Sequence, residues 1–312
     1  MKTKRVRSNA DRCERISWAD LDPAYTRGLI DLARKEDLLG SGFSRRPAHR
    51  GDVTTRVLIT DSVPGEASLV AREAMTVCGL PLVPMILESY GAKGLFHPSC
   101  RDGDSVLPRE RLGTFKVSAD RLLTAERVIL NFLQRLSGIA TQTACFVQAL
   151  GDSQTRLLDT RKTTPGFRAL EKYAVACGGA WNHRLGLNDR VLIKDNHLAA
   201  RDSGSGKALH DAVLLSRKRN PDLLIEVEID RLDQLPPVMD ARPDIVMLDN
   251  FKPVNIRKAV SLIDGRAATE ASGGVSRKTL PGLARLGLDF ISCGALVHQS
   301  RWVDIGLDWT TK

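Results

Sequence analysis

The sequence predicts an α/β protein whose C-terminal half forms an α/β barrel and whose N-terminal part mixes helices and strands. Three observations favour this fold class. Short apolar segments alternate with helical stretches from about residue 156 onward. Each apolar segment ends in a polar or charged residue, as expected where strands carry functional groups at their carboxyl ends. A chain of 312 residues is also long enough to form two domains of unequal size.

The N-terminal part is predicted to contain a polar leader, one helix and a loop. Apolar residues at helical spacing within residues 1–38 indicate a helix that begins near Asp20, Asp22 or Pro23. Residues 39–51 are rich in glycine, serine and arginine and predict a loop. The leader is interpreted as a solvated or disordered basic tail, with a functional arm as the alternative. Its cations are Lys2, Lys4, Arg5, Arg7, Arg12 and Arg15.

The middle of the chain predicts an α+β region followed by a long helix. Short apolar runs between residues 57 and 123 alternate with turn residues such as those at 102–104. The amphipathic pattern from Thr124 to Leu150 predicts a helix with Thr124 as its N-cap residue. Gly151 and Asp152 are expected to end this helix.

Strands and helices are then predicted to alternate through the rest of the chain. This pattern is typical of an α/β barrel, in which the carboxyl ends of the strands carry the active site. The expected strands are 156–159, 191–194, 224–229, 245–249, 268–272 and 290–293. The expected helices include 208–217, 230–239, 253–262 and 278–286.

Charge and composition narrow the class of ligand. The net charge is +9 and the pI is near 9.4, which suits polyanionic ligands. A nucleic-acid-binding protein is an alternative, and it would bind a polyanion column in a salt-dependent way. However, aromatic residues make up only 5% of the chain and the basic residues are interspersed with carboxylates. Because nucleic-acid recognition commonly uses stacking side chains along a basic surface, a small anionic ligand is favoured.

The cysteines and the hydropathy pattern bear on redox state and location. The six cysteines show no Cys-x-x-Cys spacing and lie mostly among apolar neighbours, so they are predicted to be reduced core thiols. No segment approaches the ~18 uninterrupted apolar residues that indicate a membrane-spanning helix. The N-terminus lacks the apolar region of a signal peptide. We therefore expect a cytoplasmic protein.

A cluster of cations between Leu157 and His197 is the strongest functional signal in the chain. Cationic side chains and two histidines lie here among turn residues such as those at 163–166. Cations that follow the ends of barrel strands converge on one edge of the sheet. The segment therefore predicts an anion-binding site. The members considered are Arg161, Lys162, Arg168, Lys172, His183, Arg184, Lys194 and His197.

Four motifs lie in this segment: DTRKTTPG (159–166), EKYAV (171–175), NHRLGL (182–187) and LIKDNH (192–197). They closely resemble motifs of the quinolinate phosphoribosyltransferase family, also called nicotinate-nucleotide pyrophosphorylase (carboxylating). Further similar blocks occur in order, so the resemblance covers roughly residues 52–306. These blocks are ER (126–127), NFL (131–133), LSGIAT (136–141), EVE (226–228), LDNF (248–251), EASGG (270–274) and ISCGAL (291–296).

The resemblance implies a two-domain fold. The N-terminal domain would be an α+β open-sheet sandwich, and the C-terminal domain a TIM-like α/β barrel that is incomplete, with fewer than eight strands. We expect these domains at residues 1–130 and 131–297, with residues 298–312 returning to the N-terminal domain. One departure from the family is the loop at 41–50, an insertion of about ten residues. A surface loop tolerates such an insertion at small entropic cost.

The implied acceptor, quinolinate, is a pyridine dicarboxylate. Its binding requires several cations, ideally arginines able to make bidentate contacts. Lys162 is expected between quinolinate and the second substrate, and Lys162 and Lys194 are also counted as catalytic. By motif position, the resemblance assigns quinolinate binding to Arg127, Thr160, Arg161, Lys162, His183, Arg184 and Lys194.

Other charged residues of the segment receive different expectations. Arg168 and Lys172 lie on the following predicted helix, where we expect surface ion pairs with residues such as Glu171. His183 and His197 are candidates for a general acid. The alternative for each histidine is that it orients the ligand.

The implied second substrate is 5-phosphoribosyl 1-pyrophosphate, together with Mg²⁺. Glu228 and Asp249 end two successive predicted strands and supply the oxygen ligands that a magnesium ion and ribose hydroxyls require. Both are counted as catalytic and as metal ligands. The alternative is that these carboxylates cap the helices that follow. Glu226 lies on the same strand face as Glu228 and is expected to support it.

Two glycine-bearing turns are expected to bind phosphate. Ser272-Gly273-Gly274 and Cys293-Gly294-Ala295 follow the last two predicted strands. Backbone N–H groups in such turns, at the start of a helix, bind phosphate through their aligned dipoles. The alternative is that both are simple strand-to-helix turns. Cys293 is interpreted as a conservative replacement for a small apolar residue, without a chemical role.

The resemblance implies transfer of phosphoribosyl to quinolinate with decarboxylation, which gives nicotinate mononucleotide, CO₂ and pyrophosphate in NAD biosynthesis. A molybdenum-transport-associated paralogue of the same fold is the nearest alternative, and a nicotinate phosphoribosyltransferase is another. The block at 193–197 favours quinolinate because Lys194 supplies a cation to the dicarboxylate. In the family, the arginine that matches Arg127 reaches into the partner's site, so we expect a homodimer.

Overall fold

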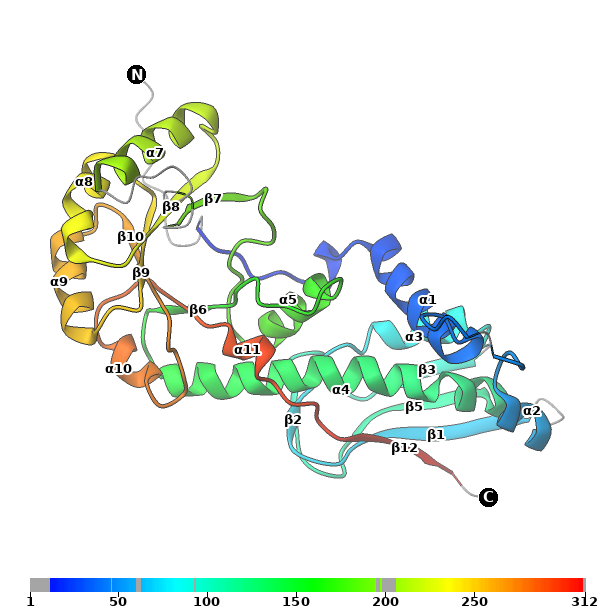
Figure 1. Ribbon diagram of the computed structural model, residues 1–312. Coiled ribbons are helices and arrows are strands. Elements are labelled where there is room, and N and C mark those ends of the chain that lie inside the picture. The colour runs from blue at the N-terminus through cyan, green and yellow to red at the C-terminus, as the bar shows by residue number, and fades with distance from the viewer. Residues whose placement is uncertain are drawn as a thin grey trace. The chain divides into compact units, whose positions relative to one another are not determined.

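The computed structural model describes residues 12–45, 47–59, 63–92, 94–194, 197 and 206–310. The chain forms two compact units, and most of their elements are labelled in Figure 1. The barrel unit contains residues 1–16, 145–163 and 180–299, and the sheet unit contains residues 17–144, 164–179 and 300–312. Several residues named above lie outside the described ones, namely Lys2, Lys4, Arg5 and Arg7 of the leader and Asp195 and Asn196 of the motif at 192–197.

The division differs from the expected boundary at residue 130 for two physical reasons. Helix α4 (Ala119–Leu150) is continuous, and most of it belongs to the sheet unit. Helix α5 (Arg168–Cys177) also packs in the sheet unit, where Glu171 Oε1 lies 2.6 Å from Nη2 of Arg135. Lys172 is fully buried as well. The expectation that Lys172 and Glu171 form surface ion pairs is therefore wrong.

The sheet unit is built on a four-stranded antiparallel sheet in the order β12-β1-β5-β3. Its C-terminal strand pairs with β1, so that Ala67 lies opposite Trp309. The core holds fully buried side chains of the sheet and of α4, such as Leu112, Phe115 and Leu133. The strands are β1 (Pro64–Ala71), β3 (Gly94–Pro98), β5 (Arg111–Ser118) and β12 (Ile305–Trp309), with β2 (Met75–Thr76) and β4 (Ser105–Val106) forming a separate pair.

The helices of the sheet unit are α1 (Pro23–Leu39), α2 (Val53–Leu58), α3 (Leu82–Ser89), α4 and α5, with the short η2 (Trp18–Asp20) before α1. The start of α1 is confirmed, because Asp22 accepts a hydrogen bond from Ala24 N at its N-cap. The predicted N-cap Thr124 is wrong. Helix α4 starts at Ala119, directly after β5, and Thr124 Oγ1 donates to Asp120 O one turn earlier (2.8 Å).

The barrel unit contains a six-stranded parallel sheet in the order β6-β11-β10-β9-β8-β7. Each of the six strands predicted from the sequence is present, within one residue at either end. They are β6 (Arg156–Leu158), β7 (Arg190–Ile193), β8 (Leu224–Ile229), β9 (Ile245–Asp249), β10 (Ala268–Ser272) and β11 (Phe290–Ser292). The incomplete barrel with fewer than eight strands is thus confirmed.

The expected helices of the barrel unit are also present, with one difference. The predicted helix at 230–239 is divided into η3 (Leu232–Gln234) and α8 (Leu235–Asp240), because Pro236 and Pro237 lack the backbone N–H that a continuous helix needs. The other helices are α7 (Gly206–Arg219), α9 (Pro253–Ile263), α10 (Leu280–Ala284) and α11 (Ala295–His298).

Part of the N-terminal leader is tied to the barrel sheet. Within the described residues, β6 and β7 are the two edge strands and do not pair with each other. Trp181 bridges to Leu158 of β6, and Glu14 bridges to Asn182. Arg12 accepts a hydrogen bond from the Arg190 guanidinium through its backbone oxygen. The guanidinium of Arg15 stacks on Trp181, 4.6 Å from the ring centroid. For Arg12 and Arg15, the expectation of a solvated tail is therefore wrong.

Two further expectations concern the membrane and the cysteines. Among the described residues, no helix combines the length and the hydropathy needed to cross a membrane. All six cysteines are free. Cys13, Cys78 and Cys293 are buried, whereas Cys100, Cys145 and Cys177 are only half-buried. The free cysteines are consistent with the prediction of reduced thiols, and the prediction of core positions holds for the first three.

Candidate anion-binding site of the barrel unit

Most of the predicted site residues of the barrel unit come from the carboxyl ends of its parallel strands, whereas His183 and Arg184 lie on the segment between β6 and β7. Because the strands are parallel, these ends meet at one edge of the sheet. Arg127 lies instead on α4, in the sheet unit, and its side chain is exposed. Glu228 is the next-to-last residue of β8. The other residues end a strand or follow it within four positions, namely Thr160, Arg161 and Lys162 (β6), Lys194 (β7), Asp249 (β9), Ser272, Gly273 and Gly274 (β10), and Cys293, Gly294 and Ala295 (β11).

Two arginines form the cationic centre of the site. Nε of Arg161 is buried and has no hydrogen-bond partner among the described residues. Burial lowers the pKa of Arg184, and the positive charge of Arg161 nearby lowers it further. Two guanidinium groups that repel each other, one with an unused buried donor, are stabilised when an anion binds both. This arrangement supports the predicted anion site.

Asp159 positions this part of the site, and the sequence analysis did not single it out. It is fully buried at the end of β6 and accepts hydrogen bonds from Asn182 Nδ2 (2.9 Å) and His183 N (2.8 Å). These bonds fix the segment 182–184 beside the residues that follow β6. Asp159 is the first residue of the motif DTRKTTPG, so its position in the motif could have identified it. The search for cations passed over it because it is an acid.

His183 is only 6% exposed and faces two carboxylates that come from β8 and β10. Its Nε2 lies 3.3 Å from Glu226 Oε1 and 3.5 Å from Glu270 Oε1. Burial alone would lower the pKa of His183, but Glu226 and Glu270 raise it to about 9. In the opposite sense, Arg184 N donates to Nδ1 (2.8 Å), which favours an unprotonated Nδ1. In both protonation states Nε2 carries a proton toward Glu226.

Glu226 is fully buried, and its negative charge is balanced by Arg190 and His183. No hydrogen bond with Glu228, which Glu226 was expected to support, is found among the described residues. Oε2 of Glu226 lies 2.8 Å from Nη1 of Arg190. Burial raises the pKa of Glu226, yet His183 and Arg190 outweigh this effect and hold it at about 2. Arg190, which the sequence analysis also missed, begins β7, so its side chain and the His183 ring lie around one buried carboxylate. Both oxygens of Glu270 are buried without a hydrogen-bond partner among the described residues.

His183 and Arg184 also line a hollow near the amino ends of β7 and β8. Its volume is about 290 Å³. Arg190 and Leu224, which begin these strands, form part of its wall. Arg184 thus lines this hollow and also lies near Arg161, which follows β6. The lining residues are Arg12, Cys13, Glu14, Asn182, His183, Arg184, Asp189, Arg190 and Leu224.

Lys194 and Glu228 form a direct ion pair at the carboxyl ends of β7 and β8. Nζ of Lys194 lies 2.5 Å from Glu228 Oε2, and the side chains are 38% and 12% exposed. Asp249, at the end of β9, accepts a hydrogen bond from Asn250 Nδ2 (2.7 Å). Neither carboxylate is an N-cap, because η3 and α9 begin after Arg231 and Lys252. The helix-cap alternative is therefore wrong.

The glycine turns differ from each other. Gly273 has a φ of +93°, and a Cβ there would lie 2.0 Å from Asn250 Oδ1, so only glycine fits. The helix after this turn begins at Leu280, within the predicted stretch 278–286, so the turn at 272–274 does not lead directly into a helix. The second turn leads directly into α11. A Cβ on Gly294 would lie 2.8 Å from Cδ of Lys162, so this lysine runs along the turn.

Two remaining residues have simple surroundings. Cys293 is buried, and burial raises the pKa of its thiol, which fits the interpretation that it has no chemical role. His197 is exposed, and its Nδ1 accepts a hydrogen bond from Lys194 N (3.0 Å). His197 therefore positions the backbone of Lys194.

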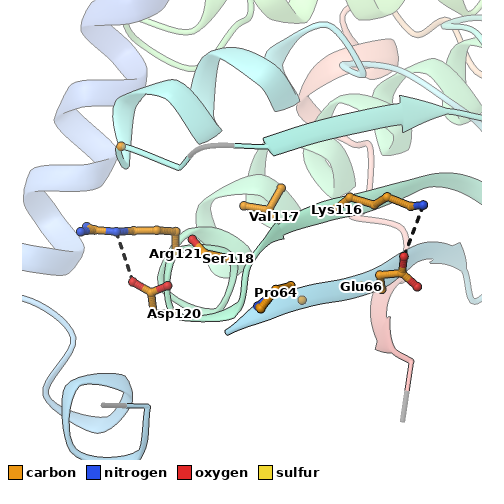
Figure 2. Close-up of a pocket in the computed structure, with 9 residues that line it drawn as sticks. Pro64, Glu66, Lys116, Val117, Ser118, Asp120 and Arg121 are labelled. Carbon is orange, nitrogen blue, oxygen red and sulfur yellow. Dashed lines mark ion pairs between the residues drawn. The ribbon is translucent and has the colours of Figure 1, made fainter. Parts of the chain in front are cut away.

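Another hollow, of about 610 Å³, lies in the sheet unit between the start of β1, the end of β5 and the start of α4. Figure 2 shows that its cations are already paired with carboxylates. Lys116 Nζ lies 3.4 Å from Glu66, and Arg121 Nε lies 3.3 Å from Asp120. This hollow therefore lacks the unbalanced cations that distinguish Arg161 and Arg184.

Comparisons with known proteins show the family to which the chain belongs. Residues 52–137 match the family model described as the N-terminal domain of quinolinate phosphoribosyl transferase, and residues 139–308 match that of its C-terminal domain. A nicotinate-nucleotide pyrophosphorylase [carboxylating] of Mycobacterium leprae is 40% identical over 264 residues, which cover 82% of this chain and 90% of the relative. A chloroplastic relative of the same name from Arabidopsis thaliana is 36% identical over 306 residues, covering 93% and 84%. The solved nicotinate-nucleotide pyrophosphorylase of Francisella tularensis has a TM-score of 0.84 and 35% identity, covering 93% of this chain and 98% of that one.

Proposed function

Because this chain belongs to the quinolinate phosphoribosyl transferase family, we propose that it transfers the phosphoribosyl group of 5-phosphoribosyl 1-pyrophosphate to quinolinate, with loss of CO₂. The products are nicotinate mononucleotide, CO₂ and pyrophosphate. The observation that carries the proposal is the pair of mutually repelling guanidinium groups, Arg161 and Arg184, with an unused buried donor on Arg161.

The acceptor is bound through its two carboxylates. Arg161 and Arg184 are suited to bidentate contacts with carboxylates. Thr160 and His183 border these arginines in the chain, and Lys194 adds a further cation. Lys194 is paired with Glu228, so the binding of quinolinate at Lys194 would require this pair to loosen. The cation set as a whole favours a dicarboxylate over a monocarboxylate.

The donor is held where β8 to β11 end. Glu228 and Asp249 offer carboxylate oxygens, the ligand type that Mg²⁺ prefers, and would hold a magnesium ion that arrives with the donor. When bound, the ion would offset the negative charge of the pyrophosphate. Backbone N–H groups of the turns at 272–274 and 293–295 contact the phosphates. The side chain of Lys162 runs along Gly294 and adds a cation beside the same turn.

The chemistry needs no covalent intermediate with the protein. As the bond from the ribosyl carbon to pyrophosphate breaks, Lys162 neutralises charge on the leaving group and the nearby carboxylates stabilise the cationic ribosyl carbon. The pyridine nitrogen then donates its electron pair to that carbon. The positively charged ring stabilises the electron pair of the adjacent C–C bond as CO₂ leaves, and the ring carbon then takes up a proton from solvent. The protein contributes position and electrostatics.

The active unit is a homodimer located in the cytoplasm. Arg127 supports the dimer because it is exposed on α4, where its guanidinium is accessible to a second chain. A two-fold dimer that shared Arg127 would contain two equivalent sites, each completed by the partner.

A product assay tests the proposed function. The enzyme is given 5-phosphoribosyl 1-pyrophosphate and Mg²⁺ with either quinolinate or nicotinate, and the mononucleotide and CO₂ are measured. We expect turnover with quinolinate to exceed turnover with nicotinate by at least about 100-fold. Nicotinate has one carboxylate, so the positive charges of Arg161 and Arg184 would not both be neutralised. Equal rates with the two acceptors would contradict the proposal.

A further inference from the structure

Three side chains able to bind a metal ion converge in the sheet unit. The sulfur atoms of Cys78 and Cys177 and a carboxylate oxygen of Asp102 all lie within 4.8 Å of one another. Cys78 follows β2, Asp102 begins the turn before β4, and Cys177 is the last residue of α5. The three residues are distant in sequence, so the cluster could not be identified from a Cys-x-x-Cys spacing.

The carboxylate of the cluster is held firmly. Oδ2 of Asp102 accepts hydrogen bonds from Gly79 N (2.8 Å) and Tyr173 Oη (2.8 Å), and Oδ1 accepts one from Leu80 N (3.0 Å). A carboxylate oxygen accepts about two hydrogen bonds, so Oδ1 retains a free electron pair. The cluster therefore contains an oriented oxygen donor beside the two thiols.

The cluster concentrates groups that become negative, and it is open on one side. Cys78 is fully buried, and its pKa is raised by burial, by Cys177 and by Asp102. A divalent cation would replace the two thiol protons and remove the mutual repulsion of the three groups. Cys177 is half-buried, which leaves a route from solvent.

We propose that Cys78, Cys177 and Asp102 bind a soft divalent cation such as Zn²⁺. Two thiolates and a carboxylate are common zinc ligands, and a water molecule at the open side would complete a tetrahedral set. Binding forms two metal–sulfur bonds and releases two protons to solvent, with no change of oxidation state. The ion would fasten the end of α5 to the turn at 102–104.

Cadmium is a suitable probe because cadmium thiolates absorb in the near ultraviolet. The full-length protein, reduced and stripped of metal, is titrated with Cd²⁺. We expect one equivalent to bind with thiolate absorption, to release two protons and to raise the melting temperature. Zn²⁺ should displace the signal, whereas Mg²⁺ should not, because thiolates disfavour hard cations.

Matched variants locate the site. Cys177→Ser changes one half-buried sulfur and should lose the absorption and the thermal shift, as should Cys78→Ser. Cys145 is also half-buried but lies on α4, outside the cluster, so Cys145→Ser should keep both signals. Cys177→Ser alone decides the matter if the buried Cys78 variant fails to fold.

Two results would overturn the proposal. One is unchanged cadmium binding in Cys177→Ser. The other is a protein that takes up no Cd²⁺ after reduction but forms a Cys78–Cys177 disulfide on oxidation, which would make the pair a redox element. Neither result bears on phosphoribosyl transfer, because the titration uses no substrate.

Discussion

Lys194 and Glu228 form a 2.5 Å ion pair at the carboxyl ends of two adjacent strands, although the proposed function requires them to serve different ligands. Lys194 is assigned to the acceptor, and Glu228 is assigned to the donor and its metal ion. Each neutralises the other in the structure. Under the proposed function, substrate binding would exchange this internal ion pair for two external ones, which would link occupancy of the two substrate sites.

Carboxylate variants test the donor site. Replacing Glu228 or Asp249 by Ala should raise the KM for 5-phosphoribosyl 1-pyrophosphate at low Mg²⁺ by at least about tenfold, because an oxygen ligand is lost. The fold should persist, since neither residue caps a helix. Steady-state kinetics at varied donor and Mg²⁺ measure the effect, with Asp230→Ala as a control on an exposed neighbouring carboxylate. Wild-type rates in both variants would remove these residues from the site.

The charge of His183 can be read from the pH dependence of stability. Its pKa is raised from 6.5 to about 9 in the folded chain. The resulting stabilisation should be complete below pH 6.5 and lost as the pH rises toward 9, by at most about 1.4 kcal/mol per pH unit. Urea unfolding of wild type and His183→Gln across this range measures the difference. A constant difference would mean that the ring stays neutral, as the hydrogen bond from Arg184 N favours.

The inserted loop at 41–50 should be dispensable for chemistry. Its ends are already close, because Gly51 N donates to Leu38 O (2.8 Å) after the turn at Gly40. Removing residues 41–50 and joining the ends with a short glycine linker should leave kcat and both KM values within about threefold of wild type. A deletion variant that melts normally but fails to bind substrate in calorimetry would identify the loop as part of the site.

Mixed dimers test whether Arg127 acts across a subunit interface. Arg127→Ala and Lys194→Ala homodimers should each be nearly inactive, because each lacks a cation in both sites. After subunit exchange, half the dimers are mixed, and each has one complete site of two, so roughly a quarter of wild-type activity should return. Differently tagged subunits confirm the exchange. Activity that stays at the parental level after confirmed exchange would place Arg127 in its own chain's site.

The sequence alone determined the strands of the barrel and the residues that follow them. Apolar runs that end in a polar residue are local patterns, so β8, β9 and β10 were predicted to the residue. The cations of the motifs could be identified from the sequence because a motif depends only on residue type and order. The proline pair at 236–237, which divides the predicted helix at 230–239, is likewise a local signal in the sequence.

Only the tertiary structure decided which groups lie together. Nothing local indicates that Arg190 and His183 surround Glu226, that Lys172 is buried in the sheet unit, or that Arg12 and Arg15 are fixed to the barrel. The same holds for the start of α4, where β5 passes directly into the helix and a tertiary contact, Ala119 N to Val63 O, replaces the expected cap. Burial and charge balance depend on residues distant in sequence, and the packed chain alone brings them within range of one another.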